Sequence, residues 1–489
     1  MENQQHIIKI NLPGGIVSPG DLNEILTIAQ KHHVSTVRFG NRQQLLFTVD
    51  KSQLEDLQDS FLVADVDYEL DEDRYANIVS SYVTEEVLYT SNWLREGVYK
   101  DILNGFTYKP ELKINLVDYY QNLIPFFTGN FNFISSEKSN FWYLYIRFPK
   151  TNSMYCWPSL VYSEDIPLIS KALEKIILTE KDTFYNQQNI DGILLFEKID
   201  AANQFLHQPY ENPLVHTGFQ LPYYEGFNKY GNNKLWLGIY RRNETFSIPF
   251  LKEICTLCLN TRIGQLYTTA WKSLVVKSIN LEDRKYWSTL LNKYRINVRH
   301  AANELNWQLE DICQEAIDIK LELVKHFEEA DLRTYPLCFA IKTKANTGLF
   351  GSVIIRKRNA VSKFGEALFE VLHTHNFNPN AKEYVTFAMS VSRQQLGESL
   401  IALCDYFYDL HVGESPEVEI KPKAKPAETF INVHQCKNCF TIYDERFGDL
   451  AQNIAPNTPF ESLESYICPT CDAPKQDFVA IEMPKVAYL

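Results

Sequence analysis

Apolar residues recur at helical spacing in two stretches that lie far apart along the chain. Between Asp21 and Ala29, apolar side chains stand at positions 22, 25, 26 and 29, which predicts a helix with one apolar face. Alternating apolar residues follow at Val37–Phe39 and Leu45–Val49, separated by a Gly-Asn turn. This second pattern predicts two paired strands, so the segment is expected to be a helix followed by a hairpin.

The same order of elements is expected a second time. The segment Asp21–Val49 aligns without gaps on Phe250–Ser278, at a constant offset of 229 residues. Five positions are identical, which in the first copy are Leu22, Glu24, Ile25, Thr27 and Leu45. Five identities alone could arise by chance. Because both copies also share the change from helical to strand periodicity, we interpret them as a duplicated unit.

Other apolar runs complete the outline. The aromatic runs Asn122–Phe133 and Asn140–Phe148 predict buried strands. The apolar segment Lys252–Asn260 carries a Cys-x-x-Cys pair at helical spacing, which favours core packing over metal or redox use. A charged, proline-bearing stretch without apolar periodicity, Gly413–Glu428, predicts an extended linker before the last sixty or so residues.

Composition narrows the classes of function. The chain has 489 residues, enough for two to four domains, and a formal net charge of −13. An acidic chain argues against nucleic acid as a partner, since phosphate binding needs a basic face. The absence of a signal sequence and of a long apolar run predicts no membrane contact, and ten cysteines without a disulfide pattern predict a cytoplasmic protein.

Two cysteine pairs near the C-terminus are the strongest chemical signal. Cys436 and Cys439 form one Cys-x-x-Cys, and Cys468 and Cys471 form another. Each pair can place two thiolates on one turn, and two such turns can enclose one tetrahedral metal ion. Four thiolates suit either iron or zinc, so the spacing alone leaves the metal open.

An ordered set of aromatic and turn residues surrounds these pairs: Tyr443-Asp444, Gly448-Asp449, Ile454-Ala455-Pro456, Thr458-Pro459-Phe460, Leu463, Tyr466, Cys468-Pro469, Lys475 and Phe478. These residues resemble rubredoxin, a carrier that holds a single iron. The resemblance implies one iron cycling between Fe3+ and Fe2+, with a fold that depends on the metal because so small a module buries little apolar surface.

Four positions depart from the rubredoxin pattern. Phe440 and Asp472 stand where a glycine usually follows each cysteine pair, and Asn453 and Asn457 replace two loop glycines. If the backbone keeps a positive φ there, Asp and Asn are tolerated, whereas Phe440 is strained by about 1–2 kcal/mol.

The duplicated unit resembles the ferredoxin-like half-domains of sirohaem-containing nitrite and sulfite reductases, in which each half-domain precedes a larger α/β domain. The resemblance covers about residues 8–375 and includes the strand turn Val37–Gln43. It implies that basic side chains face a bound anion or the carboxylates of the cofactor, and the candidates are Arg38, Arg42, Arg74 and Lys113. Glu111, where that family places a lysine, opposes anion binding.

The cofactor ligands of these reductases are not retained. The family holds its 4Fe-4S cluster through four cysteines, and the corresponding positions here are Trp307, Cys313, Lys344 and Gly348. Only one of the four can supply a thiolate. We therefore expect neither the cluster nor sirohaem, whose axial ligand is one of those cysteines.

These observations predict an α+β protein: duplicated reductase-like half-domains with mixed α/β domains, then a small iron-bound β module. The expected domains are 1–60 and 226–290 (half-domains), 61–225 and 291–412 (α/β domains), 413–428 (linker) and 429–489 (rubredoxin domain). Three functions compete: an electron carrier whose body docks redox partners in nitrate, nitrite or sulfite assimilation, an active sirohaem-type reductase with a fused donor, and a zinc-stabilised interaction protein. The missing thiolates and the rubredoxin-type residues favour the first.

Overall fold

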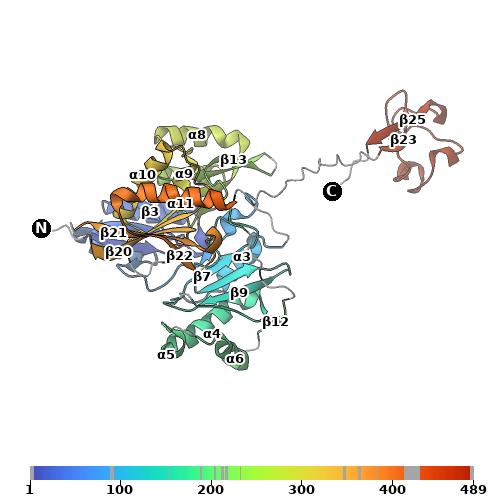
Figure 1. The fold of residues 1–489 in the computed structure, drawn as a ribbon. Helices are drawn as coiled ribbons and strands as arrows, with labels where there is room; N and C mark the ends of the chain where they lie inside the picture. Colours follow the sequence, from blue (N-terminus) through green and yellow to red (C-terminus); the bar gives the residue numbers. More distant parts are fainter. Residues whose placement is uncertain are drawn as a thin grey trace. The chain divides into compact units, whose positions relative to one another are not determined.

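The computed structural model divides the chain into two compact units, Met1–Asp409, here called the body, and Leu410–Leu489, the C-terminal unit (Figure 1). It describes residues 5–88, 93–151, 153–187, 190–202, 205–210, 214, 218–231, 233–344, 348–361, 365–381, 383–411 and 430–484. The predicted linker Gly413–Glu428 lies outside these ranges. No helix among the described residues is long and apolar enough to cross a membrane.

The duplication is confirmed by the order of elements. The first copy consists of β1 (Gln5–Ile10), β2 (Ile16–Val17), α1 (Pro19–Lys31), β3 (Thr36–Phe39), β4 (Leu45–Asp50) and α2 (Lys51–Val63). The second consists of β14 (Lys234–Ile239), β15 (Phe246–Ser247), α7 (Ile248–Asn260), β16 (Leu266–Thr268), β17 (Leu274–Asn280) and α8 (Arg284–Lys293). Helix α7 begins and ends 229 residues after α1 (248 − 19 and 260 − 31), which is the offset found in the sequence.

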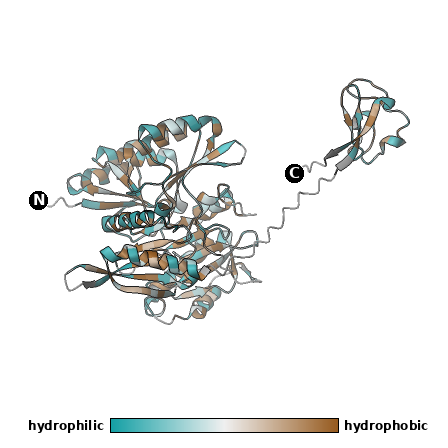
Figure 2. Ribbon diagram, turned by 45° about the horizontal axis from the view of Figure 1, so that its top comes forward, coloured by the Kyte–Doolittle hydropathy of each residue, from teal (hydrophilic) through white to brown (hydrophobic). Residues whose placement is uncertain are grey.

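Local sequence explains where the first helix begins and which face it buries. Ser18 caps α1 by accepting a hydrogen bond from the backbone N–H of Asp21 at 3.0 Å, and Pro19 occupies the first helical position. The apolar stripe predicted from Leu22 to Ala29 is the buried face. The hydropathy colours in Figure 2 show apolar and polar residues alternating along the helices of the body.

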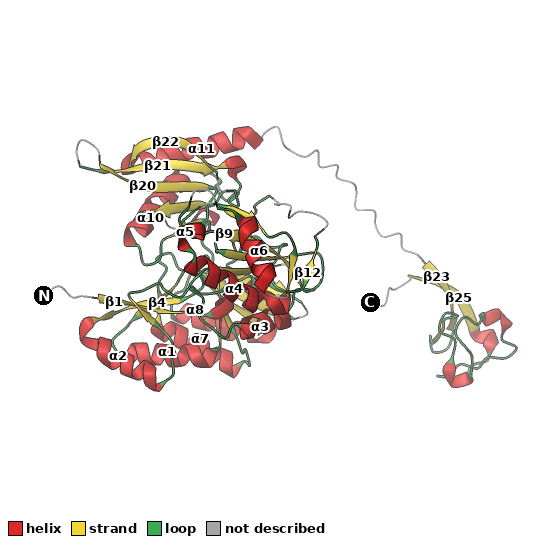
Figure 3. Ribbon diagram, turned by 90° about the horizontal axis from the view of Figure 1, so that it is seen from below, coloured by secondary structure: helices red, strands yellow, loops and turns green. Residues whose placement is uncertain are grey.

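The two copies exchange a short strand. Strand β15 of the second copy pairs with β3 of the first, with Phe246 opposite Val37, and β2 of the first pairs with β16 of the second, with Val17 opposite Leu266. The resulting sheets run β15-β3-β4-β1-β5 and β13-β14-β17-β16-β2, with β5 at Glu69–Leu70 and β13 at Gly226–Tyr230. One apolar core serves both copies, and α1, α2 and α7 lie together on one side of the body (Figure 3).

Each copy is followed by a larger mixed sheet. The first runs β12-β11-β9-β8-β7-β6, with β10 beside β9: β6 (Val79–Ser80), β7 (Ile114–Val117), β8 (Phe131–Ser135), β9 (Phe141–Arg147), β10 (Met154–Cys156), β11 (Leu160–Tyr162) and β12 (His207–Gln208). Its helices are α3 (Glu96–Gly105), α4 (Ile166–Thr179), α5 (Lys181–Phe184) and α6 (Gly192–Ala202). Strands β6, β7 and β8 are parallel, and the remaining pairs are antiparallel.

The second larger sheet repeats this plan. It runs β18-β19-β20-β21-β22: β18 (Trp307–Leu309), β19 (Phe339–Lys342), β20 (Val353–Val361), β21 (Ala367–Thr374) and β22 (Tyr384–Ser392). Its first three strands are parallel and the rest are antiparallel. Helices α9 (Ala302–Leu305), α10 (Gln314–Glu329) and α11 (Leu396–His411) accompany it. The predicted α+β fold with mixed sheets is therefore confirmed.

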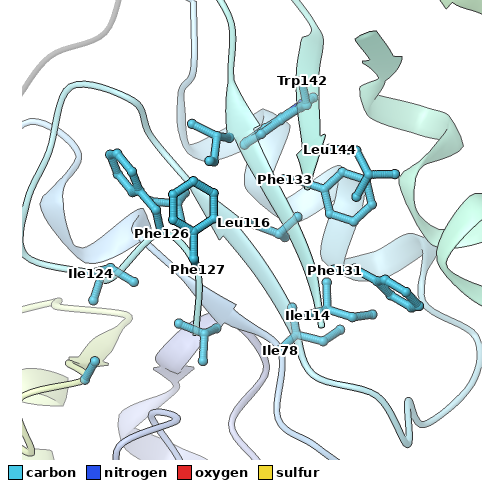
Figure 4. Packing of buried hydrophobic residues seen from close by; sticks show 14 of the residues in the cluster. Ile78, Ile114, Leu116, Ile124, Phe126, Phe127, Phe131, Phe133, Trp142 and Leu144 are labelled. Carbon is cyan, nitrogen blue, oxygen red and sulfur yellow. The ribbon is translucent and has the colours of Figure 1, made fainter. Parts of the chain in front are cut away.

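One predicted strand is partly wrong. The run Asn122–Phe133 forms a strand only from Phe131 onward, and its earlier part is a buried turn. The side chain of Gln121 explains how that backbone tolerates burial: it accepts from the N–H of Ile124 at 2.7 Å and donates to its carbonyl at 3.0 Å. Figure 4 shows Phe126 and Phe127 turned into the same apolar core as the strand residues.

The C-terminal unit contains a small sheet and an aromatic core. The sheet runs β24-β23-β25, with β23 at Phe430–Cys436, β24 at Ile442–Tyr443 and β25 at Phe478–Pro484. Tyr443, Phe460, Tyr466 and Phe478 are buried together, and the ring centroids of Tyr443 and Tyr466 lie 5.1 Å apart. This cluster contains few large side chains, as expected for a module that needs a metal to be stable.

Candidate metal centre and a candidate anion site

The two cysteine pairs lie on matching turns. In the first, the N–H of Cys436 donates to the carbonyl of Thr441 at 2.9 Å, and the N–H of Phe440 donates back to the carbonyl of Cys436 at 3.0 Å. In the second, Cys468 N–H donates to Ala473 at 2.8 Å and Asp472 N–H donates to Cys468 at 3.0 Å. Equal spacing with equal bonds therefore produces two turns of the same geometry.

The positive φ anticipated from the sequence is present. Phe440 has a φ of 63° and Asp472 a φ of 60°, and the loop residues Asn453 and Asn457 have values of 59° and 66°. These are the four positions at which side chains replace the usual glycines. The backbone path is thus retained, and Phe440 carries the strain because its side chain offers no local hydrogen bond to offset it.

The four sulfur atoms converge on one point. Their ligand atoms all lie within 4.8 Å of one another, with Cys436 Sγ 3.6 Å from Cys471 Sγ and Cys439 Sγ 3.3 Å from Cys468 Sγ. A tetrahedral site with metal–sulfur distances of about 2.3 Å has sulfur–sulfur edges of about 3.8 Å. The arrangement fits a four-thiolate metal ion, and all four cysteines are free thiols rather than disulfides.

The tetrad is closed on one side and open on the other. Cys436 and Cys468 are fully buried, whereas Cys439 is half-buried and Cys471 is exposed. The hydroxyl oxygen of Thr441 lies 3.1 Å from Cys439 Sγ, and hydrogen bonding from Thr441 lowers the pKa of the Cys439 thiol to about 6. The thiolate form needed for metal binding is therefore favoured at this position.

The body contains a separate polar cavity of about 300 Å³. Two of the predicted anion-site residues, Arg42 and Lys113, line it, together with Lys344 and Gly348. Sequence reasoning did not anticipate the other charged residues around it, because they come from distant segments without a shared motif: Lys9, Asp73, Glu310 and Asp311. These three carboxylates balance much of the positive charge.

Arg42 and Lys113 differ in the hydrogen bonds that their charged groups already make. The buried guanidinium of Arg42 donates to the carbonyls of Asn77 and Ile114 at 2.8 and 2.9 Å, and burial lowers its pKa to about 10. No hydrogen-bond acceptor contacts the Lys113 ammonium group among the described residues, and its pKa is lowered by burial and then by Arg42. A ligand of the cavity would therefore meet Lys113 first.

The other two candidate arginines lie elsewhere. Arg74 is exposed and forms an ion pair at 3.2 Å with Glu111, while Arg38 is half-buried on β3. Neither lines the cavity. The sequence resemblance predicts that Glu111 opposes binding of an anion. In the structure its carboxylate is paired with Arg74 instead.

The residues aligned with the cluster ligands of the reductases do not have the chemistry of iron–sulfur ligands. Trp307 stacks on Phe339 with ring centroids 4.8 Å apart in an apolar core, and Cys313 Sγ lies 3.4 Å from the hydroxyl of Thr343. Among the described residues, the C-terminal tetrad is the one group of three or more side chains able to hold a metal. That the body binds neither cluster nor sirohaem stays a prediction.

Comparison with known proteins agrees with this division of the chain. The rubredoxin family profile matches residues 433–478, and "Probable rubredoxin HupI" of Bradyrhizobium diazoefficiens is 53% identical over 49 residues, which are 10% of this chain and 71% of that protein. Through its C-terminal unit the chain belongs to the rubredoxin family. The Rubredoxin-1 of Chlorobaculum tepidum is 36% identical over 58 residues, which are 12% of this chain and 84% of that protein.

The body is similar to proteins of a different kind. Residues 1–63 match the nitrite/sulfite reductase ferredoxin-like half domain. The solved structure of the NirA protein of Mycobacterium tuberculosis superposes with a TM-score of 0.61 at 14% identity, covering 81% of this chain and 79% of that one. This likeness establishes the fold of the body. The chain is therefore a fusion of a reductase-like body and a rubredoxin domain, and the four clustered cysteines of that domain indicate one iron.

Proposed function

We propose that this protein is a one-electron carrier whose iron is bound by Cys436, Cys439, Cys468 and Cys471. The convergence of four free thiols in a rubredoxin domain carries the proposal. Bound iron would supply the Fe3+/Fe2+ couple. The two matching turns hold the thiolates in one geometry, so little rearrangement accompanies a change of charge, and exposed Cys471 offers the electron a short route to a partner.

Aerobic purification followed by an absorption spectrum and metal analysis tests this proposal. We expect the visible bands of a ferric tetrathiolate and one iron per chain. One zinc per chain and no visible absorption would instead support a zinc-stabilised interaction protein. Sirohaem or 4Fe-4S absorption would favour a working reductase with a fused donor.

The charge of the rubredoxin domain favours a basic partner. Residues 429–489 contain eight acidic and four basic side chains, a net charge of −4, and a ferric ion with four thiolates adds about one more negative charge. Complementary charge increases the rate of encounter more than it increases affinity. We propose that the physiological partner is a reductase or an electron donor with a basic patch around its redox group.

We further propose that the body serves as a docking platform for that partner in nitrate, nitrite or sulfite assimilation. The family match of its first half-domain and its reductase-like fold support this role. The experiment is to mix the full chain with candidate sirohaem reductases and follow complex formation and oxidation of the reduced iron. Absence of both with every candidate would count against the docking role and leave the carrier function standing.

A second activity of the body is binding of a small anion. The ammonium group of Lys113, together with Arg42 and Lys344 around the same cavity, favours it. Calorimetric titration with nitrite, sulfite and sulfate tests the idea. We expect Lys113→Ala to weaken binding, while Arg74→Ala, whose side chain lies outside the cavity, leaves it unchanged.

A further inference from the structure

A threonine hydroxyl lies against one of the four sulfur atoms. Thr441 follows the first cysteine turn, and its Oγ1 is 3.1 Å from Cys439 Sγ. Its backbone is held by the same turn, because its carbonyl accepts the N–H of Cys436 at 2.9 Å. A β-branched side chain has few rotamers, so the hydroxyl stays near the sulfur once the backbone is fixed.

We infer that Thr441 is a positioning residue that raises the reduction potential of the bound iron by donating its hydroxyl proton to the Cys439 thiolate. The inference rests on the proposed one-electron function. A metal-bound thiolate carries no proton, so Thr441 must be the donor in this contact. Cys439 is one of the two sulfur ligands on the open side of the tetrad, where an electron would pass.

A second threonine competes for the Thr441 proton. Thr470 stands between the cysteines of the other turn, and the Thr441 hydroxyl donates to its Oγ1 at 2.9 Å. A hydroxyl has one proton, so Thr441 donates either to Thr470 or to Cys439. A metal-bound thiolate is negatively charged and is the stronger acceptor, so iron binding should direct the proton to sulfur.

The effect on the potential follows from charge. Reduction adds one electron and changes the charge of iron with four thiolates from about −1 to −2, and no other bond is made or broken. A donor aimed at sulfur stabilises the more negative state more strongly, so it favours reduction. We expect up to about a tenfold change in the equilibrium constant, which for one electron corresponds to 59 mV.

The experiment uses the full chain and compares midpoint potentials, followed by the ferric–thiolate absorption, for Thr441→Val, Thr441→Ser and Thr470→Val. Valine keeps the shape of threonine without its hydroxyl, and we expect a lower potential. Serine keeps the hydroxyl and should restore most of the wild-type value. Thr470→Val removes the competing acceptor of the Thr441 proton, so it should not lower the potential. Thr458→Val is the matched control, because its hydroxyl bonds to the carbonyl of Ala455 and not to sulfur.

The outcomes separate this inference from the proposed function. An unchanged potential in a Thr441→Val protein that still holds one iron overturns the inference and leaves the carrier function intact. A wild-type protein without iron overturns the carrier function itself. Thr441→Ala repeats the comparison if the valine variant loses iron. Loss of iron from both variants would show that Thr441 holds the metal in place rather than tuning it, which also overturns the inference.

Discussion

Phe440 offers a direct test of the backbone geometry around the metal. It occupies the left-handed region at a φ of 63°, yet 69% of its side chain is exposed. A residue with a Cβ costs about 1–2 kcal/mol in this conformation relative to glycine. Burial of the ring can offset little of that cost. The strain should therefore become measurable when Phe440 is replaced either by glycine, which relieves it, or by alanine, which does not.

The magnitude follows from a comparison of Phe440→Gly with Phe440→Ala. Both variants lose the buried third of the ring, worth about 0.5–1 kcal/mol if full burial of phenylalanine is worth about 1.5–3 kcal/mol. Only glycine relieves the left-handed strain. Glycine also makes the unfolded chain more flexible, which lowers the free energy of unfolding by about 0.4–1 kcal/mol relative to alanine. We therefore expect the glycine variant to be more stable than the alanine variant by about 1 kcal/mol.

The assay is denaturant unfolding of the iron-loaded chain, followed by loss of the ferric–thiolate absorption. All seven tryptophans lie in the body, so their fluorescence reports its unfolding separately. Lys437, an exposed residue of the same turn that lacks a positive φ, is the matched control. There alanine should be the more stable replacement. If alanine equals or exceeds glycine at position 440, the left-handed backbone assigned to Phe440 is incorrect.

Four further predictions follow from the same structure. Replacing Cys468 with alanine should abolish the visible absorption and unfold the rubredoxin domain, as shown by proteolysis, and a variant that kept its colour would remove this residue from the ligand set. A fragment of residues 1–412 should be folded and colourless, and sirohaem absorbance in it would contradict the prediction. Burial lowers the pKa of Lys277 to about 8, so the unfolded state binds the extra proton between about pH 8 and 10.4 and stability should rise there by at most about 1.4 kcal/mol per pH unit. Lys277→Met should flatten that rise in tryptophan-monitored unfolding, and an unchanged slope would contradict the assignment. Electron transfer to an outside partner should slow markedly between about 20 and 300 mM salt, and a rate that is flat across this range would exclude electrostatic steering.

The metal centre was predictable because its information is local. Two Cys-x-x-Cys pairs specify two turns, and each turn closes through hydrogen bonds within six residues, so spacing alone indicates which sulfur atoms converge. The positive φ of Asp472 and Phe440 follows in the same way, since the path of the turn is retained when glycine is replaced. The contact of Thr441 with sulfur was missed, because the sequence does not show which way a threonine hydroxyl after a cysteine pair points until the path of the turn is known.

The duplicated body shows where sequence periodicity stops being informative. The apolar stripe of α1 and the 229-residue offset identify the repeated element, because helix faces are encoded by spacing within one segment. The exchange of β2 and β15 is not encoded in that way: each is two residues long and pairs with a strand from the other copy. The buried turn before Phe131 is also hard to recognise from sequence. Its side chains are buried on all sides, so it lacks the alternation of apolar and polar residues that would distinguish a strand from a turn.

The two parts of the chain obtain their stability from different sources. Trp307, which aligns with a cluster ligand of the reductases, stacks on Phe339 and donates its indole N–H to the carbonyl of Asn303 at 2.7 Å. That position therefore contributes apolar packing and a satisfied polar group, so the body can fold without a cluster. The rubredoxin domain has only a small aromatic core, and we expect its stability to depend on the metal. Availability of iron should thus control the electron carrier while leaving the body folded, which is consistent with a body that serves to bind a partner.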